Sequence, residues 1–177
     1  MLRGSLPGKQ GKNQTMSGAA LKVGDLAPAF SLPTTGGGRV ALADLQGQTV
    51  VLYFYPKDDT PGCTQQAISF GEKADEFAAV GAIVIGVSRD SLASHEKFVT
   101  KHGLQVTLAS DVEGEACEAY GVWKEKSLYG RKFMGIERST FVIDAQGRLA
   151  GVFRKVKAAH YVSAPLEAAQ KCALQMR

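Results

Sequence analysis

Residues 49–55 have the sequence TVVLYFY and are followed by Pro56. This run of β-branched and aromatic residues is typical of a strand buried on both faces, and we expect it at the centre of a sheet. A second apolar run, AIVIGV, covers residues 82–87, and the segment 61–79 between the two runs has the character of a helix. A strand, a helix and a second strand form a βαβ unit, which predicts that the two strands are parallel.

The rest of the chain continues this alternation of strands and helices with short connections. The pattern predicts an α/β fold built around a largely buried sheet. A turn with the sequence TTGGG is expected at residues 34–38 between two short strands, and the turn Ala145-Gln146-Gly147 is expected to join an antiparallel pair. The other predicted elements are helices over 91–101 (capped by Ser91), 113–120 and 162–174, and strands over 106–108, 139–144 and 149–156.

Length and composition indicate one globular domain. The chain has 177 residues, of which 45% are hydrophobic and 21% are charged, close to the averages for globular domains. We place the domain at residues 21–177. Residues 1–20 are expected to form a flexible tail, because they are rich in Gly, Ser, Gln, Asn and Lys and have few apolar positions. This tail lacks the continuous apolar run of a secretory signal, and we expect the protein in the cytoplasm.

The distribution of charge and apolar residues argues against two classes of partner. The formal net charge is +4, but Arg3, Lys9 and Lys12 supply three of these charges within the expected tail, so no concentrated basic stripe remains for nucleic acid. No apolar run approaches the roughly 20 residues of a membrane span. We therefore expect neither nucleic acid nor a membrane as a partner.

The three cysteines, Cys63, Cys117 and Cys172, lie far apart in the sequence. This spacing is typical neither of a disulfide framework nor of a metal site built on Cys-x-x-Cys pairs. The three histidines provide no matching cluster of ligands. We therefore expect no metal ion.

The stretch that carries chemistry has the sequence PKDDTPGCT and covers residues 56–64. It connects the carboxyl end of the strongest predicted strand to the start of a predicted helix, where open α/β sheets place their reactive groups. Thr60 suits the N-cap position, and Pro61 suits the first helical position. Cys63 then lies in the first helical turn, where free backbone N–H groups and the helix dipole favour a thiolate.

A helix terminus alone falls short of ionising a thiol at neutral pH. A free thiol has a pKa near ~8.5, so a mostly ionised thiol needs a drop of roughly two units, or about 2.7 kcal/mol. A helix N-terminus supplies ~0.3–1 kcal/mol, and up to ~2 kcal/mol in favourable geometry. We therefore expect a cation or a hydroxyl donor near the sulfur, with Thr60 as a local hydroxyl. The sulfur is also expected to be open to a small oxidant.

Several blocks of the sequence together resemble one protein family. The pattern Pro56-x-x-x-Thr60-x-x-Cys63 matches the active-site motif of the peroxiredoxins, and YPKDDTPGCT at residues 55–64 is similar to their bacterioferritin comigratory protein, or peroxiredoxin Q, branch. The resemblance covers about residues 21–174 and implies a thioredoxin-like fold, a central mixed β-sheet flanked by helices. Three further blocks match in order: GVSRDS (86–91), YGVW (120–123) and GIERSTFVID (135–144).

The resemblance implies a thiol peroxidase and assigns roles to four residues. Cys63 is the implied peroxidatic nucleophile, Thr60 positions the peroxide through its hydroxyl, and Pro56 shields the pocket. Arg138, at the start of a strand expected beside the 49–55 strand, is the implied cation that stabilises the thiolate and the departing oxygen.

The implied reaction is attack of the thiolate on hydrogen peroxide or an organic hydroperoxide, which leaves a sulfenic acid. An external thiol, from thioredoxin, glutaredoxin or glutathione, then supplies the reducing equivalents. No metal, haem or flavin cofactor is required, and we expect a monomer or a weak dimer.

The chain departs from this branch at the resolving cysteine. Many members place that cysteine five residues after the nucleophile, where this chain has Ile68, and others place it further along, where this chain has Val99. Two interpretations stay open. In the one that we favour, a one-cysteine enzyme is reduced directly by an external thiol; in the other, Cys117 or Cys172 is an atypical partner. Cys117 is expected to pack in the core.

A second departure is Gln66, one helical turn after Cys63, where the family usually has Glu. An amide in place of a carboxylate removes a nearby negative charge, which favours the thiolate slightly. His95, on the apolar side of a predicted helix, is interpreted as a hydrogen-bonded structural residue and not as a general base.

A basic, Gly-containing loop is predicted near residue 130 and is interpreted as solvated surface, with the docking of an acidic reductant protein as the alternative. Its positive charges are Lys124, Lys126, Arg131 and Lys132.

Two other functions are weighed against the peroxidase. A general thiol-disulfide oxidoreductase on the same fold is disfavoured, because the stretch Thr60-Pro-Gly-Cys63 lacks the first cysteine of a Cys-x-x-Cys pair. A non-enzymatic chaperone or signalling partner, with Cys63 as a redox sensor, is the third hypothesis.

Overall fold

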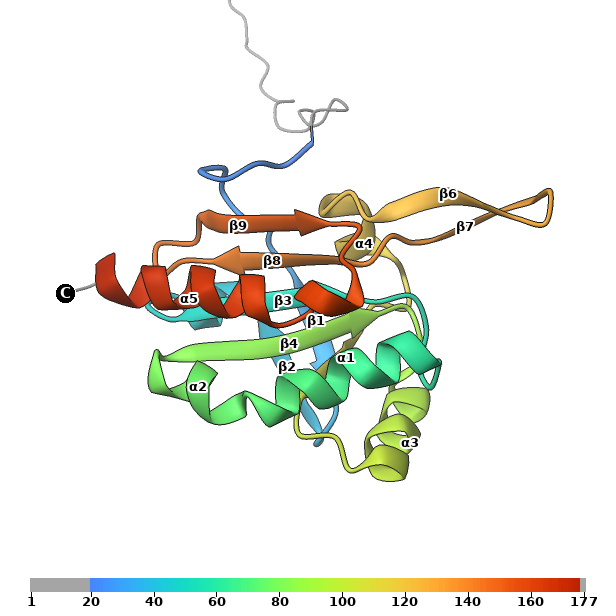
Figure 1. Cartoon of the computed structure of the whole chain (residues 1–177), viewed down its shortest axis with the longest axis horizontal. Helices are drawn as coiled ribbons and strands as arrows, with labels where there is room; N and C mark the ends of the chain where they lie inside the picture. The colour runs from blue at the N-terminus through green and yellow to red at the C-terminus, as the bar shows by residue number, and fades with distance from the viewer. Residues whose placement is uncertain (1–19, 176–177) are drawn as a thin grey trace, which may run out of the picture.

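The computed structural model describes residues 20–175, which form a seven-stranded mixed sheet, a separate two-stranded sheet and flanking helices (Figure 1). Almost all of the expected tail at residues 1–20 lies outside this range. The sheet order is β2-β1-β5-β4-β3-β8-β9. Its strands are β1 (Ser31–Thr34), β2 (Gly38–Ala41), β3 (Thr49–Phe54), β4 (Ala82–Ser88), β5 (Thr107–Ser110), β8 (Ser139–Ile143) and β9 (Leu149–Arg154).

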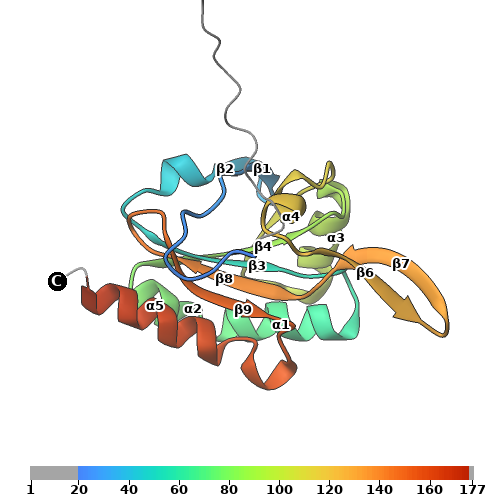
Figure 2. The same cartoon turned by 90° about the horizontal axis from the view of Figure 1, so that it is seen from above.

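Helices cover both faces of this sheet (Figure 2). Helices α1, α2 and α5 lie on one face, and α4 packs on the other. None of the helices within residues 20–175 has the length and apolar character of a membrane span. The helices are α1 (Pro61–Glu72), α2 (Ala74–Ala79), α3 (Leu92–His102), α4 (Glu115–Ala119) and α5 (Ser163–Gln175), with short 3-10 turns at Leu42–Leu45 and Ala158–His160.

Strand β3 is the centre of the sheet, as its apolar run predicts. All six of its residues are buried. It pairs in parallel with β4 and antiparallel with β8, which confirms both the βαβ unit and a mixed sheet. The predicted antiparallel pair of β8 and β9 and the predicted cap of α3 are also confirmed, since the Ser91 side chain accepts a hydrogen bond from the backbone N–H of Ser94.

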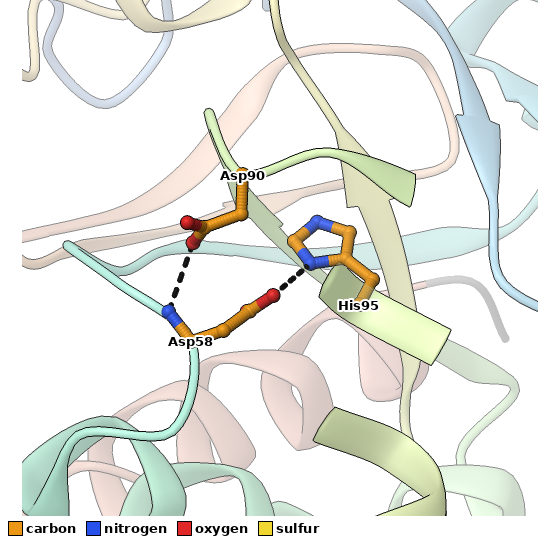
Figure 3. A group of neighbouring side chains, drawn as sticks. All are labelled: Asp58, Asp90 and His95. Carbon is orange, nitrogen blue, oxygen red and sulfur yellow. Dashed lines mark hydrogen bonds and ion pairs between the residues drawn. The ribbon is translucent and has the colours of Figure 1, made fainter. Parts of the chain in front are cut away.

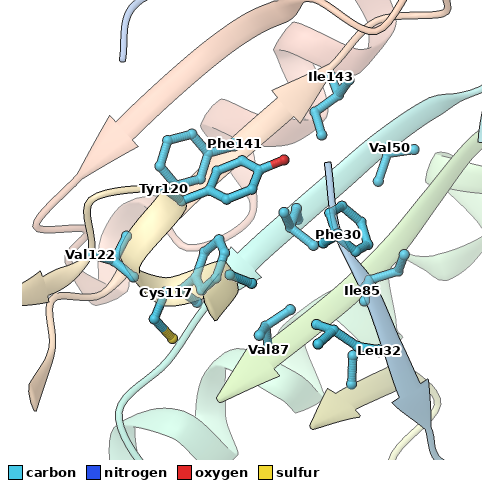
Figure 4. Close-up of a cluster of buried hydrophobic side chains, with 14 of the residues drawn as sticks. Phe30, Leu32, Val50, Ile85, Val87, Cys117, Tyr120, Val122, Phe141 and Ile143 are labelled. Atoms are coloured by element: carbon cyan, nitrogen blue, oxygen red, sulfur yellow. The ribbon is translucent and has the colours of Figure 1, made fainter. Parts of the chain in front are cut away.

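The sheet separates two hydrophobic cores. The core on the side of α4 is rich in aromatic rings, with the Tyr120 centroid 5.2 Å from Phe54 and 5.0 Å from Phe141 (Figure 4). The other core lies beneath α1, α2 and α5. Cys117 belongs to the first core, whereas Cys63 and Cys172 belong to the second.

The predicted helical segment over residues 61–79 is confirmed in its bounds, but it consists of two helices, α1 and α2. The break is at Lys73, whose backbone angles are φ −104° and ψ 14°, and whose N–H bonds to the carbonyl of Phe70. Gly71 weakens the helix there by about 1 kcal/mol relative to alanine. It also packs closely, because a Cβ atom at Gly71 would lie 3.4 Å from Cβ of Gln105.

The prediction of a basic loop near residue 130 is wrong, because those residues form a β-hairpin. Strands β6 (Trp123–Leu128) and β7 (Arg131–Ile136) pair antiparallel and project from the body of the protein (Figures 1 and 2). Tyr129 and Gly130 join them with φ angles of 53° and 78°. Two successive positive φ angles favour the tight turn that matches the twist of paired strands.

Candidate active site

The active-site loop leaves the carboxyl end of β3 and enters α1 at Pro61. Thr60 occupies the N-cap position in extended backbone, and Pro61 is the first helical residue, as the sequence predicts. Within the described residues no side chain caps this helix, because the Thr60 hydroxyl instead donates to the carbonyl of Lys57 at 2.9 Å. Pro56 lies half-buried at the start of this loop.

Cys63 is the third residue of α1, and its sulfur meets a guanidinium from a distant part of the chain. Nη2 of Arg138 lies 3.4 Å from the Cys63 Sγ atom. Arg138 immediately precedes β8, whose first residue, Ser139, pairs with Phe54 at the end of β3. The antiparallel register therefore brings the start of β8 and the end of β3 to the same edge, where α1 begins.

Two neighbours hold the guanidinium of Arg138 in place. Nη1 donates to Oε1 of Gln66 at 2.6 Å, and the ring centroid of Tyr161 lies 5.2 Å from Cζ. Gln66 is fully buried, and among the described residues its Nε2 has no hydrogen-bond partner. The amide thus orients the guanidinium without neutralising it, and a second donor stays unused inside the site.

The expectation of an exposed thiol differs from the structure, in which Cys63 is only 1% exposed. The helix terminus is crowded by the two side chains that pack on Gly62. A Cβ atom at Gly62 would lie 3.2 Å from Nη2 of Arg138 and 3.4 Å from the Tyr161 hydroxyl. A surface hollow runs along α1; it is lined by Asp59, Thr60, Pro61, Thr64, Gln65, Ile68, Ser69, Glu72 and His102.

A buried hydrogen-bond network anchors the loop that carries Thr60 (Figure 3). His95 Nδ1 lies 2.7 Å from Oδ2 of Asp58, and the Tyr55 hydroxyl donates to Oδ1 at 2.7 Å. The Asp58 N–H donates to the Asp90 carboxylate at 2.8 Å, and His95 Nε2 lies 2.9 Å from the carbonyl of Ala109. The structural interpretation of His95 is therefore confirmed.

This network also sets the charge of Asp58. Burial raises the pKa of the Asp58 carboxyl, but the hydrogen bonds from His95 and Tyr55 outweigh burial and hold that pKa below its ordinary value. Asp58, Asp90 and His95 lie close enough together to bind a cation. Their polar atoms instead satisfy one another and the backbone, so the arrangement is that of a structural network.

The other two cysteines lie away from the Cys63 sulfur, and all three thiols are free. Cys117 is on the opposite side of the sheet, where burial and the neighbouring Asp111 carboxylate raise the pKa of its thiol. This confirms the expected packing role. Burial and the Asp144 carboxylate raise the pKa of the Cys172 thiol, and the neighbouring Thr49 opposes that rise. Thr49 begins β3, and this strand rises roughly 17 Å from Thr49 to Phe54, the end that leads to Cys63.

Sequence reasoning missed two contributors to the site. Tyr161, in the turn before α5, lies beside the guanidinium, and nothing in its local sequence distinguishes it from a core tyrosine. Asp58 was visible in the stretch of residues 56–64, but its partner His95 lies in another helix.

Comparisons with known proteins identify several relatives. The sequence matches the AhpC/TSA family over residues 23–152. It is 46% identical to peroxiredoxin Bcp of Bacillus subtilis (83% of this chain, 94% of the relative) and 45% identical to peroxiredoxin Bcp of Escherichia coli (80% and 90%).

Solved structures with similar folds include bacterial peroxiredoxins. The structure of the Xanthomonas campestris bacterioferritin comigratory protein, described as having alkyl peroxide reduction activity, superposes with a TM-score of 0.77 at 42% identity, over 81% of this chain and 92% of that protein. A cysteine-to-serine mutant of PrxQ from Xylella fastidiosa superposes with a TM-score of 0.79 at 36% identity, over 90% and 100%. These neighbours confirm the peroxiredoxin form of the thioredoxin-like fold.

Proposed function

Because the chain belongs to the AhpC/TSA family and is a thiol-dependent peroxidase, we propose that Cys63 is its peroxidatic nucleophile and that hydrogen peroxide and organic hydroperoxides are its substrates. The observation that carries this assignment is the 3.4 Å contact between Arg138 Nη2 and the Cys63 sulfur. That contact occurs at the uncapped amino end of α1. The cation and the helix terminus together favour the thiolate more than either does alone.

The proposed reaction follows from this arrangement. The thiolate attacks one peroxide oxygen, an S–O bond forms, and the O–O bond breaks with its electron pair passing to the leaving oxygen. That oxygen takes a proton and departs as water or an alcohol, and Cys63 becomes a sulfenic acid. Arg138 stabilises the charge that develops on the leaving oxygen. The Thr60 hydroxyl already donates to Lys57, so its lone pairs accept a hydrogen bond from the peroxide O–H.

We further propose one-cysteine chemistry, in which an external thiol reduces the sulfenic acid directly. The resolving positions of the relatives hold Ile68 and Val99 here. Cys117 is on the far side of the sheet. Cys172 lies near Thr49, at the opposite end of β3 from the loop that leads to Cys63, and a disulfide tolerates a Cα separation of only about 7 Å. Both placements support direct reduction.

The proposal also covers the cellular compartment and the oligomeric state of the enzyme. Three free cysteines support a reducing compartment such as the cytoplasm. Activity as a monomer or weak dimer is also part of the proposal, since Cys63, Gln66 and Arg138 meet without a residue from a second chain.

Intact-mass analysis after one equivalent of peroxide, with dimedone present as a sulfenic-acid trap, tests these assignments. We expect one adduct on Cys63, none in C63S, and unchanged adducts in C117S and C172S. A loss of two hydrogens with Cys63 linked to Cys117 or Cys172 would contradict one-cysteine chemistry.

Peroxide consumption with excess dithiothreitol tests the peroxidase activity itself. We expect turnover in the wild type and in C117S and C172S, and none in C63S. The absence of turnover in the wild type would favour a redox-sensing chaperone, and reduction of insulin disulfides in its place would favour a general oxidoreductase.

A further inference from the structure

The hairpin of β6 and β7 has two chemically different faces. Its antiparallel register pairs Lys124 with Gly135, Lys126 with Phe133 and Leu128 with Arg131. Directly paired residues share one face of a two-stranded sheet, and the residues between them point to the other. One face therefore holds Lys124, Lys126, Leu128, Arg131, Phe133 and Gly135, and we call it the basic face.

The basic face carries three cations and no carboxylate. Within residues 20–175 none of these three cations forms an ion pair. Leu128 and Phe133 lie between them and are 56% and 46% exposed. The face thus combines uncompensated positive charge with two exposed apolar side chains.

The opposite face is already occupied or compensated. At its base, Ile136 is buried and Arg89 lies 4.5 Å from the ring centroid of Trp123. Further out, Lys132 and Glu125 lie 3.9 Å apart and offset each other's charge. Met134 on this face is also 49% exposed, but of the hairpin's two faces, within the described residues, only the basic face carries cations without an ion-pair partner.

The base of the hairpin leads into the active site, because β7 ends at Ile136, two residues before Arg138. The Lys126 side chain leans over Gly135, where a Cβ atom would lie 3.3 Å from its Cδ atom. Burial and then the charge of Arg138 lower the pKa of the Lys126 ammonium, whereas Cys63 and Glu137 raise it. Lys126 is therefore within electrostatic range of the reactive sulfur, and the basic face runs outward from that point.

We propose that the basic face is the docking surface for the protein that reduces the enzyme, a dithiol protein with an acidic and partly apolar surface around its reactive thiol. This inference rests on the proposed function, because it needs a sulfenic acid at Cys63. One partner thiol attacks the Cys63 sulfur and forms a mixed disulfide with release of water. The second partner thiol then attacks the partner's own sulfur in that mixed disulfide, which releases reduced Cys63 and leaves a disulfide in the partner.

Charge and shape favour this occupant over two others. A second copy of the chain would bring the same uncompensated cations to the contact, and like charges repel across an interface. A nucleic acid would match the cations but not Leu128 and Phe133, because phosphate backbones are bound by polar and charged groups. An acidic protein matches both the charge and the apolar side chains.

The test compares two neighbouring residues on opposite faces, Arg131 and Lys132. Each is replaced by glutamate, so R131E and K132E change the net charge equally. Peroxide consumption is measured with an acidic thioredoxin, recycled by its reductase, and separately with dithiothreitol. We expect R131E to raise the KM for thioredoxin roughly tenfold and K132E to raise it less than about twofold. Both variants should keep wild-type turnover with dithiothreitol.

Each other outcome has a definite meaning. If R131E and K132E raise the KM for thioredoxin equally, the attraction depends only on net charge. If neither variant changes this KM, the hairpin does not dock the partner. Either result overturns the inference. Loss of dithiothreitol turnover in R131E would place the effect on the active site and also overturn it. If the wild type sediments as a dimer and R131E sediments as a monomer, the basic face is a contact between two copies of the chain, which also overturns the inference. Absence of dithiothreitol turnover in the wild type would instead refute the proposed function.

Discussion

Replacing Arg138 by methionine tests the electrostatic basis of the site. Methionine keeps much of the length of the side chain and removes its charge. We expect the peroxide step to slow in R138M, because the only guanidinium within hydrogen-bond distance of Sγ in the described structure is removed.

The size of the effect can be worked from the contact. Two unit charges about 4 Å apart interact by about 4 kcal/mol at an effective dielectric constant near 20. Arg138 is half-buried, and we take roughly half of this value for solvent screening, which leaves about 2 kcal/mol. A loss of this size in the reacting state corresponds to a roughly 30-fold slower peroxide step.

Stopped-flow measurement of the peroxide step at neutral pH, in a variant that keeps only Cys63, tests this loss. Both the attacking sulfur and the leaving oxygen lose their cation in R138M. R154M is the matched control: Arg154 lies on the neighbouring strand β9 and bonds to the carbonyls of Tyr120 and Gly121, away from the sulfur. An unchanged rate in R138M, or an equal loss in R154M, would refute the reasoning.

Two further predictions concern side chains that support the site. Q66E places a carboxylate against Arg138 Nη1, which offsets part of the guanidinium charge. The peroxide step should therefore slow about tenfold in Q66E, and less in Q66M, which adds no charge. D58N removes the carboxylate that holds His95 and should cost about 3 kcal/mol of unfolding free energy at pH 7, measured by urea denaturation. Because the folded-state pKa of Asp58 is depressed, its stabilisation is present above about pH 4 and is lost as the pH falls through that lower value. D58N should therefore flatten the acid dependence of stability, whereas D59N, at an exposed neighbour, should alter it much less; equal effects would contradict a buried anchor.

Local sequence patterns were sufficient for the parts of the fold that depend on near neighbours. The apolar run at 49–55 predicts a buried strand, and β3 is buried throughout. Pro61 marks the start of α1 and places Cys63 in its first turn. These features follow from the backbone and side-chain preferences of adjacent residues, which act within a few positions.

The structure departs from these predictions where distant contacts outweigh those preferences. The helical segment predicted over 61–79 breaks beside Gly71, which packs against Gln105 from another part of the chain. The hairpin of β6 and β7 lacks an apolar alternation over its outer half, because both of its faces are largely exposed there. The alternation of apolar and polar residues that normally indicates paired strands is therefore missing from this part of the sequence.

The active site likewise has features that local sequence determines and features that depend on distant contacts. The sequence alone determined that a cysteine lies at the amino end of a helix after a buried strand, and the calculation of its ionisation showed that a further donor was needed. The family resemblance named Arg138, but only the tertiary structure decided how its guanidinium meets the sulfur, that Gln66 and Tyr161 hold that arginine, and that Cys117 packs on the other side of the sheet. The physical reason is that Cys63 and Arg138 are 75 positions apart, so their meeting depends on the order and register of β3 and β8, which no local preference encodes.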